Sequence, residues 1–86
     1  MIIATHRTFD KKFVKLDVKI REKFKERRNL FVENPSHPLL DNHALKGDRL
    51  GQWSINITGD WRALYEFQDS GSIIFVDIDT HSNLYR

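Results

Sequence analysis

The chain has 86 residues, a formal net charge of +2 at pH 7 and no cysteine. This length suits one domain with one hydrophobic core, and we expect residues 1–86 to form it. The lack of cysteine excludes disulfides and thiolate metal sites and fits a reducing cytoplasm. Because no run of about 18 apolar residues or signal-peptide core is present, the sequence predicts a cytoplasmic protein without membrane association.

The charge is unevenly distributed along the chain. Residues 1–30 contain ten Lys and Arg and four Asp and Glu, whereas residues 31–86 contain four Lys and Arg and eight Asp and Glu. A basic segment of this kind attracts polyanions such as nucleic acids. A lysine-rich helix face in contact with solvent gives the same balance, so charge alone leaves both interpretations open.

The first segment, MIIAT, predicts a short edge strand, after which the pattern becomes helical. Apolar residues then recur at steps of three or four positions: Phe9, Phe13, Leu16, Ile20, Phe24 and Phe31. These steps are typical of an amphipathic helix, whose start Thr8 or Asp10 can cap. Periodicity does not separate one long helix from two, and Asp17 is the only plausible interior break.

The stretch ENPSHP ends the helical region, because a residue before proline is biased away from helix. Residues 35–49 read as a long connection, and such loops in small domains are often functional. Three alternating segments follow, GQWSINIT, WRALYEF and IIFVDID, separated by turns at TGD and QDSGS. They predict antiparallel strands in which Trp53 and Trp61 are core residues. His37 is expected to have a structural role.

This order predicts an α+β domain of two layers, with helices packed against one face of a mainly antiparallel sheet of about four strands. The other face is then free of helices. Along the last strand, Ile74, Val76 and Ile78 are expected to share one face. Arg62 and Asn56 alternate with apolar neighbours, so both are expected on the open face, close to the C-terminal tail.

Three stretches together resemble the RelE/ParE superfamily of small bacterial type II toxins. They are FDKKFVKLDVKIREKFKERRNLFVENP, NHALKGDRLGQWSINITGDWRALYEF and IIFVDIDTHSNLY. The ending THSNLY is most similar to the YafQ-like branch, and DWRALY is similar to the RelE-like branch. The resemblance implies a RelE-like fold in which the helical stretch forms a hairpin of two packed helices.

Toxins of these branches are ribosome-dependent endoribonucleases that cut mRNA in the ribosomal A site. The resemblance implies such an mRNA interferase, monomeric when free and hetero-oligomeric with a cognate antitoxin. It implies metal-free and cofactor-free chemistry, in which the 2′-hydroxyl attacks the adjacent phosphorus and leaves a 2′,3′-cyclic phosphate. ParE-like toxins instead inhibit DNA gyrase without cutting RNA. An inactive relative that only binds an antitoxin or RNA is a third interpretation.

Metal-free cleavage needs a base, an acid and a cation that stabilises the phosphorane. His81 matches the histidine of the YafQ-like ending, and an imidazole titrates near neutral pH, which suits both acid and base. Arg62 matches a strand arginine of RelE-like toxins and can bind two phosphate oxygens at once. Tyr85 matches an aromatic residue near the toxins' C-terminus and can stack on a splayed base.

Further candidates lie in the loop and turns. His43 matches a histidine of the YafQ-like loop and is the candidate second acid–base group. Asp60 matches an acidic residue that precedes a tryptophan in YafQ-like toxins, and it is the candidate that orients a histidine. Aspartate is also favoured in turns of this type, so its presence has a structural explanation as well. Residues assigned to RNA binding are Lys46, Arg49, Asn56 and Arg86.

Two positions depart from the YafQ-like pattern. Asn56 stands where those toxins have another histidine, and a neutral amide cannot transfer protons. Asp77 stands near a basic residue of some relatives, and a carboxylate there repels phosphate. The segment DIDTH also suggests a metal site through Asp77, Asp79 and His81, but the family mechanism needs no metal.

Overall fold

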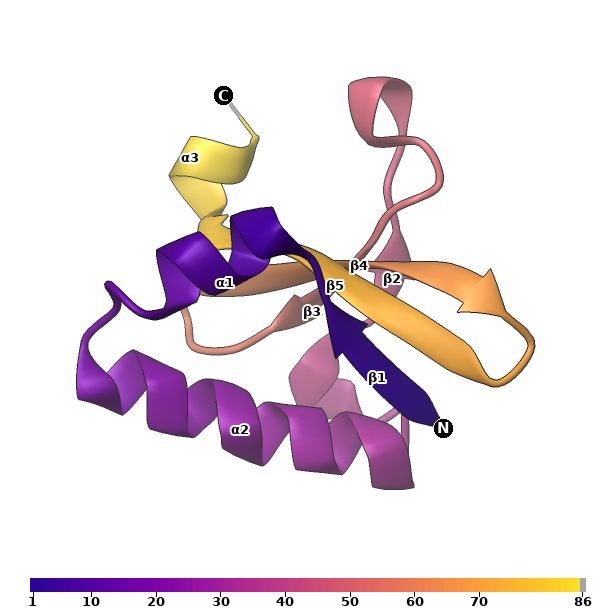
Figure 1. Ribbon diagram of the computed structural model, residues 1–86, viewed down its shortest axis with the longest axis horizontal. Helices are drawn as coiled ribbons and strands as arrows, with labels where there is room; N and C mark the ends of the chain where they lie inside the picture. The colour runs from indigo at the N-terminus through magenta and orange to yellow at the C-terminus, as the bar shows by residue number, and fades with distance from the viewer. Residues whose placement is uncertain (86) are drawn as a thin grey trace.

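The computed structural model describes residues 1–85, in which three α-helices accompany a five-stranded sheet (Figure 1). The strands are β1 (Ile2–Thr5), β2 (His43–Ala44), β3 (Trp53–Asn56), β4 (Trp61–Asp69) and β5 (Ser72–Thr80). The helices are α1 (Arg7–Phe13), α2 (Val18–Glu33) and α3 (His81–Leu84). The strand order is β1-β5-β4-β3-β2, with β1 parallel to β5 and every other pair antiparallel. The predicted α+β class is confirmed, with one more strand than expected.

The helical stretch of the sequence forms two helices, and the break falls at Asp17. Its side chain accepts a hydrogen bond from the backbone N–H of Lys19 at 3.0 Å, which caps the start of α2. The cap of α1 is His6, whose Nδ1 accepts from the backbone N–H of Thr8 at 3.1 Å. The predicted caps Thr8 and Asp10 therefore lie inside α1. Within residues 1–85, no helix has both the length and the apolar composition that a bilayer crossing requires.

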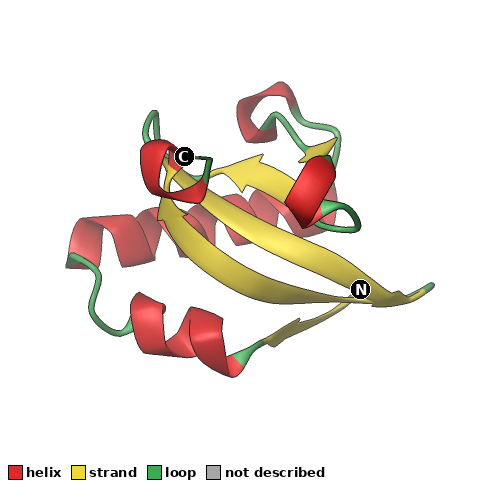
Figure 2. Ribbon diagram, turned by 90° about the horizontal axis from the view of Figure 1, so that it is seen from above, coloured by secondary structure: helices red, strands yellow, loops and turns green. Residues whose placement is uncertain are grey.

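The main core lies between α2 and one face of the sheet, which we call the core face (Figures 1 and 2). Its buried residues are Phe9, Phe24, Phe31, Leu40, Ile55, Ile57, Ala63, Tyr65, Ile73, Phe75 and Ile78. Phe75 is central, because the ring centroids of four other core aromatics lie 5.1–6.4 Å from its own. Trp53 and Trp61 pack against the border of this cluster, as predicted.

A β-bulge in β5 changes which residues of that strand face the core. The pairing of β4 with β5 skips Val76, so the alternation of side chains shifts by one residue there. The buried residues of β5 in the core are Ile73, Phe75 and Ile78. The prediction that Ile74 and Val76 share a face with Ile78 is therefore wrong, because it assumed an uninterrupted strand.

The opposite face of the sheet, which we call the site face, is not fully open. Leu45, Leu64 and Leu84 form a small cluster there and are at most 8% exposed. Leu45 comes from the loop before β3, and Leu84 comes from α3. Figures 1 and 2 show both segments on the side of the sheet opposite α2. The prediction of a helix-free face is corrected, because the C-terminal tail folds into α3 over it.

Candidate active site

A pocket of about 370 Å³ opens on the site face. Its lining residues are Asp41, His43, Arg62, His81 and Tyr85. Four of these are catalytic candidates from the sequence, and they come from β2, from β4, from the start of α3 and from the residue that follows α3. Asp41 is the lining residue that the sequence reasoning missed. We call this cavity the histidine pocket.

The β4–β5 sheet register explains how Arg62 reaches the site face. Arg62 pairs with Asn56 of β3 on one side and with Asp79 of β5 on the other. Residues paired across neighbouring strands point to the same face, so these three side chains share the site face. His43 lies on the same face from β2, where it pairs with Ser54.

The guanidinium of Arg62 is held by backbone carbonyls of the β3–β4 turn. Nη1 donates to the carbonyls of Thr58 at 2.9 Å and Trp61 at 3.0 Å, and Nη2 donates to that of Gly59 at 3.3 Å. Guanidinium has five N–H groups, so these three bonds leave Nε–H and one Nη2–H for another acceptor. Salt bridges in the described chain involve other residues, so the charge of Arg62 is not paired with a carboxylate.

Helix α3 positions His81 and Tyr85 one turn apart. The Thr80 hydroxyl caps this helix by accepting from the backbone N–H of Asn83 at 3.3 Å. The backbone N–H of His81 donates to the carbonyl of Asp60 at 2.7 Å. The rings of His81 and Tyr85 then lie 4.7 Å apart between centroids. Asp60 thus contacts His81 through its backbone, while its side chain is exposed and outside the pocket lining.

The loop before β2 orients His43. Its Nδ1 lies 2.7 Å from the carbonyl oxygen of Asp41, and 3.9 Å from the Asp41 carboxylate. Because a carbonyl oxygen only accepts, Nδ1 of neutral His43 carries the proton and Nε2 is left unprotonated. Asp41 has a φ of 43°, in the left-handed region, which turns the chain into β2.

A buried hydroxyl on the core face supports the same loop. Tyr65 Oη donates to Oδ1 of Asn42 at 2.8 Å, between Asp41 and His43. Burial raises the pKa of Tyr65 above its ordinary value, although the bond to Asn42 works against this. The hydroxyl therefore stays protonated and remains a donor to Asn42 at neutral pH.

Lys12 belongs to a network of polar contacts that connects α1, β5 and α3. Its Nζ lies 2.8 Å from Asp77 and 3.2 Å from Asp79, both on β5. Asp79 Oδ1 in turn accepts from Asn83 Nδ2 of α3 at 2.9 Å. The carboxylate predicted to repel phosphate at Asp77 is thus paired with a cation. Both carboxylates of the alternative metal site bind Lys12 as well.

The pKa values of this network follow from its contacts. Burial opposes the charge of Asp79, but hydrogen bonds from Asn83, from the Thr80 backbone and from Lys12 outweigh it and lower the pKa of Asp79. Burial likewise opposes the charge of Lys12, but the two carboxylates outweigh it and raise its pKa. Both groups are therefore held in their charged forms.

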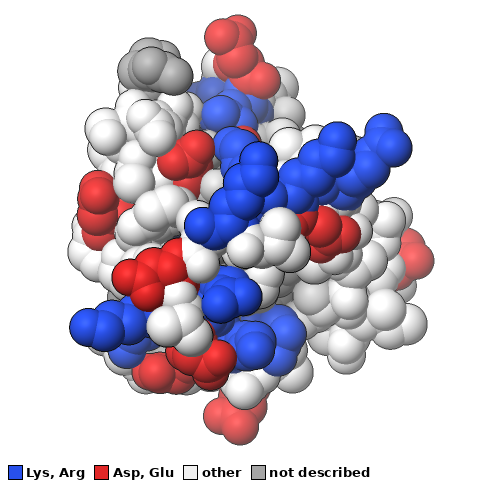
Figure 3. Space-filling view, turned by 60° about the vertical axis from the view of Figure 1, so that its left-hand side comes forward, with Lys and Arg blue, Asp and Glu red and all other residues white. Residues whose placement is uncertain are grey.

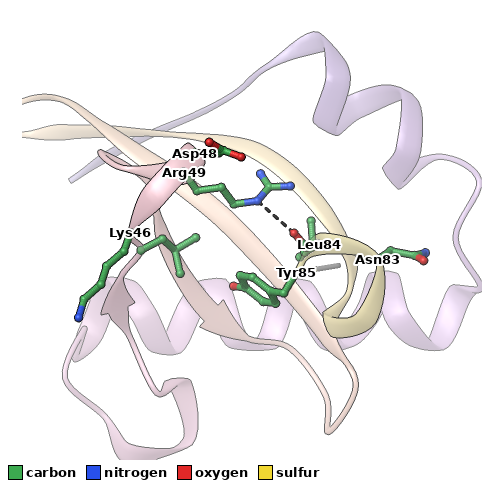
Figure 4. A pocket seen from close by; sticks show the side chains of 7 residues that line it. Lys46, Asp48, Arg49, Asn83, Leu84 and Tyr85 are labelled. Atoms are coloured by element: carbon green, nitrogen blue, oxygen red, sulfur yellow. Dashed lines mark hydrogen bonds between the residues drawn. The ribbon is translucent and has the colours of Figure 1, made fainter.

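A second pocket, of about 560 Å³, is drawn in Figure 4, and Tyr85 lines both this pocket and the histidine pocket. We call it the loop pocket, and its lining residues are Leu45, Lys46, Asp48, Arg49, Asn83, Leu84 and Tyr85. Arg49 Nε donates to the carbonyl of Leu84 at 3.2 Å, and Nη1 donates to Gln52 Oε1 at 3.2 Å. Arg49 therefore connects the loop to α3 by a hydrogen bond. It also lines the loop pocket, where it is a candidate for RNA binding.

Of the other two RNA-binding candidates, the structure describes Asn56. Asn56 lines neither pocket, and its Oδ1 is buried without a hydrogen-bond partner among residues 1–85. Arg86 lies outside the described residues.

The basic N-terminal third forms a separate surface. Figure 3 shows Lys and Arg side chains in a band over the region of α1 and α2, with Asp and Glu between them. Part of this charge is paired along α2, where Lys23 contacts Glu26 at 3.4 Å and Lys25 contacts Glu22 at 3.6 Å. Such exposed pairs are typical of a solvated helix face.

Comparisons with known proteins agree on one family. A family model described as the ParE toxin of the type II toxin–antitoxin system, parDE, matches residues 3–85. Endoribonuclease HigB of Proteus vulgaris is 41% identical over 39 residues, which are 45% of this chain and 42% of that protein. The matched segment thus spans less than half of the curated relative.

Solved structures share the fold. A YoeB/ParE toxin from Agrobacterium tumefaciens superposes with a TM-score of 0.77 at 24% identity, covering 94% of this chain and 99% of that one. YafQ from E. coli strain BL21(DE3) gives a TM-score of 0.78 at 24% identity, covering 98% of this chain and 97% of that one. The toxin–antitoxin complex RelBE2 from Mycobacterium tuberculosis gives a TM-score of 0.75 at 18% identity, covering 93% of this chain and 96% of that one. The predicted RelE-like architecture is confirmed.

Proposed function

This chain belongs to the RelE/ParE superfamily of type II toxin–antitoxin toxins, and we propose that it is an endoribonuclease that cuts mRNA on the ribosome without a metal or cofactor. The observation that carries the proposal is the histidine pocket, which gathers two imidazoles, a guanidinium and a phenol. The imidazoles and the guanidinium can supply the base, the acid and the cation that cleavage through the 2′-hydroxyl requires. The name of the partial relative HigB, an endoribonuclease, supports the same reaction.

In the proposed reaction, His43 acts as the base and His81 as the acid. In the neutral form of His43, Nε2 is the nitrogen without a proton, because Nδ1 donates to the carbonyl of Asp41 at 2.7 Å. It takes the proton of the 2′-hydroxyl, whose oxygen then attacks the adjacent phosphorus. The bond from phosphorus to the 5′-oxygen breaks, and protonated His81 gives its proton to that oxygen. The products are a 2′,3′-cyclic phosphate and a 5′-hydroxyl.

Arg62 stabilises the phosphorane in this scheme. Its Nε–H and one Nη2–H remain available to donate to phosphoryl oxygens, while three carbonyl bonds keep the guanidinium in place. Removing one such fixed donor typically costs about 10²–10³-fold in rate. Tyr85, beside His81, is assigned to hold a base next to the scissile bond.

A cognate antitoxin is the proposed partner. Solved relatives include the toxin–antitoxin complexes RelBE2 and DinJ–YafQ. We propose that this toxin is a monomer when free and a hetero-oligomer when neutralised. The basic band over α1 and α2 and the site face are the surfaces assigned to this contact.

The test is cleavage of a labelled mRNA by purified protein, with and without ribosomes. Wild type should cut in the presence of ribosomes and leave 2′,3′-cyclic phosphate ends. His81→Ala and Arg62→Ala should each lower the rate by about 10²-fold or more while the thermal unfolding temperature stays near that of wild type. Arg28→Ala, on α2, is the matched control and should cut normally. Wild-type rates in both site variants would refute the site assignment.

Gyrase inhibition without RNA cleavage is the second candidate, because the matching family model is that of ParE. That activity does not depend on the histidine pocket. A supercoiling assay with purified gyrase separates the two: inhibition that survives His81→Ala, together with no RNA cleavage, would support the second candidate.

A further inference from the structure

The loop pocket is a preformed cavity beside the histidine pocket. Its floor is apolar, because Leu45 and Leu84 are 8% and 7% exposed. The bond from Arg49 Nε to the Leu84 carbonyl, at 3.2 Å, joins the loop to α3 (Figure 4). A volume of about 560 Å³ is in the range of small-molecule sites, so the cavity can take a nucleoside-sized group.

Tyr85 links the two pockets. Its ring packs against His81 at 4.7 Å, and the residue remains 38% exposed. A nucleotide whose phosphate lies at Arg62 and His81 would bring the neighbouring base to Tyr85, on which a base can stack. The loop pocket is therefore placed to receive that base.

The polar groups of the loop pocket suit one base best. The Asp48 carboxylate only accepts hydrogen bonds, whereas Lys46 and Arg49 only donate. Within residues 1–85, salt bridges engage neither Asp48 nor Lys46. Guanine presents two adjacent donors, N1–H and the N2 amino group, with the acceptor O6 next to them. Uracil has one N–H on that edge, and adenine and cytosine have one amino group each.

We propose that the loop pocket is a guanine subsite for the nucleotide next to the scissile phosphate, and that Asp48 determines this specificity. The inference rests on the proposed function and adds the base that the nuclease selects. Asp48 accepts from N1–H and N2–H, Arg49 faces O6, and the base stacks on Tyr85. Lys46 contacts a flanking phosphate, from a different side of Tyr85 than Asp48 and Arg49 (Figure 4).

Binding of free nucleotides tests the subsite without requiring cleavage. The full chain is titrated with 5′-GMP, 5′-AMP, 5′-CMP and 5′-UMP while backbone amide shifts of residues 45–49 and 83–85 are followed by NMR. GMP should bind about tenfold more tightly than the other three. Asp48→Asn should remove this preference, because an amide offers one acceptor in place of two. Asp10→Asn, on α1, is the matched control and should leave it intact.

Equal affinity for all four nucleotides, no binding of any of them, or an unchanged GMP preference in Asp48→Asn would each overturn the inference. The readout also separates it from the proposed function. Guanine-selective binding by a protein that does not cut mRNA would retain the subsite and reject the nuclease. Ribosome-dependent cutting without guanine-selective binding would retain the nuclease and reject the subsite.

Discussion

The core face and the site face of the sheet differ in how they use the same strands. The cluster packed on the core face holds eleven buried residues, five of them Phe or Tyr, whereas the cluster on the site face holds three leucines. Within β4, Ala63 and Tyr65 belong to the first, and Arg62 and Leu64 to the second. A strand has two faces, so one segment serves stability on one side and polar pockets on the other. Substitutions on the two faces should therefore separate stability from activity.

The largest expected effect is on the core face. Phe75→Ala should lower the free energy of unfolding by about 3–5 kcal/mol, because Phe75 is fully buried among four aromatic rings. Chemical denaturation followed by circular dichroism measures this. Phe67→Ala is the control, since Phe67 is 57% exposed and should cost much less. Similar losses in both variants would contradict the contrast between buried and exposed rings.

A smaller stability effect with a larger functional one is expected on the site face. Leu84→Ala should cost about 2 kcal/mol, because the cluster holds only three buried residues. It should also lower RNA cleavage by more than this loss of folded protein explains, since Leu84 lies between His81 and Tyr85 on α3. Leu50→Ala, at a position 80% exposed, is the comparison variant. Activity that tracks the folded fraction alone would argue against a positioning role.

Tyr65 connects the two faces, and Tyr65→Phe tests that connection. Removing the hydroxyl breaks the 2.8 Å bond to Asn42 and should cost about 1 kcal/mol. The core packing of the ring is kept, so the change should be confined to the loop before β2. NMR should show shifts at Asn42 and His43 that exceed those at distant core residues. Unchanged loop shifts would show that the backbone positions His43 without this bond.

The smallest expected effect concerns the link from α1 to α3. Lys12→Met should change the free energy of unfolding by less than about 1 kcal/mol, because the Lys12 side chain is 39% exposed and solvent screens the pair. It should still shift the amide signals of α3, whose Asn83 shares Asp79 with Lys12. Lys11→Met, on the same helix, is the control. A loss of several kcal/mol would mean that the pair is more buried than the structure shows.

The same network predicts a pH dependence. The pKa of Asp79 is lowered in the folded state, so its contribution is present above its ordinary value of 3.8 and is lost as pH falls through the lower folded value. The pKa of Lys12 is raised, so its contribution is present below 10.5 and is lost as pH rises through the higher folded value. Amide shifts of α3 should therefore change below about pH 4 in wild type and not in Asp79→Asn.

Local pattern was enough for much of the fold. Alternation bounded by Gly and Asp predicted β3, β4 and β5. Periodicity left open whether the helical stretch is one helix or two, but it singled out Asp17 as the only interior break, where α2 begins. β2 and α3 escaped prediction because a two-residue strand and a four-residue helix carry too little periodicity to recognise. Neither length is stable alone, and both exist because they pack on the rest of the sheet.

For the site, the alternation of the strands predicted that Arg62 lies on the face opposite the core, and the sequence showed which residue types were available. That His43, Arg62, His81 and Tyr85 line one pocket together with Asp41 depends on how the chain folds. The tertiary structure also decided the pairing of Lys12 with Asp77 and the bond from Arg49 to Leu84, across 65 and 35 positions of the chain. Alternation and capping act between residues a few positions apart, so they reveal the face of a strand but not the distant partner that meets it. The Val76 bulge shows this limit within one strand, because the partner strand sets the shift in register.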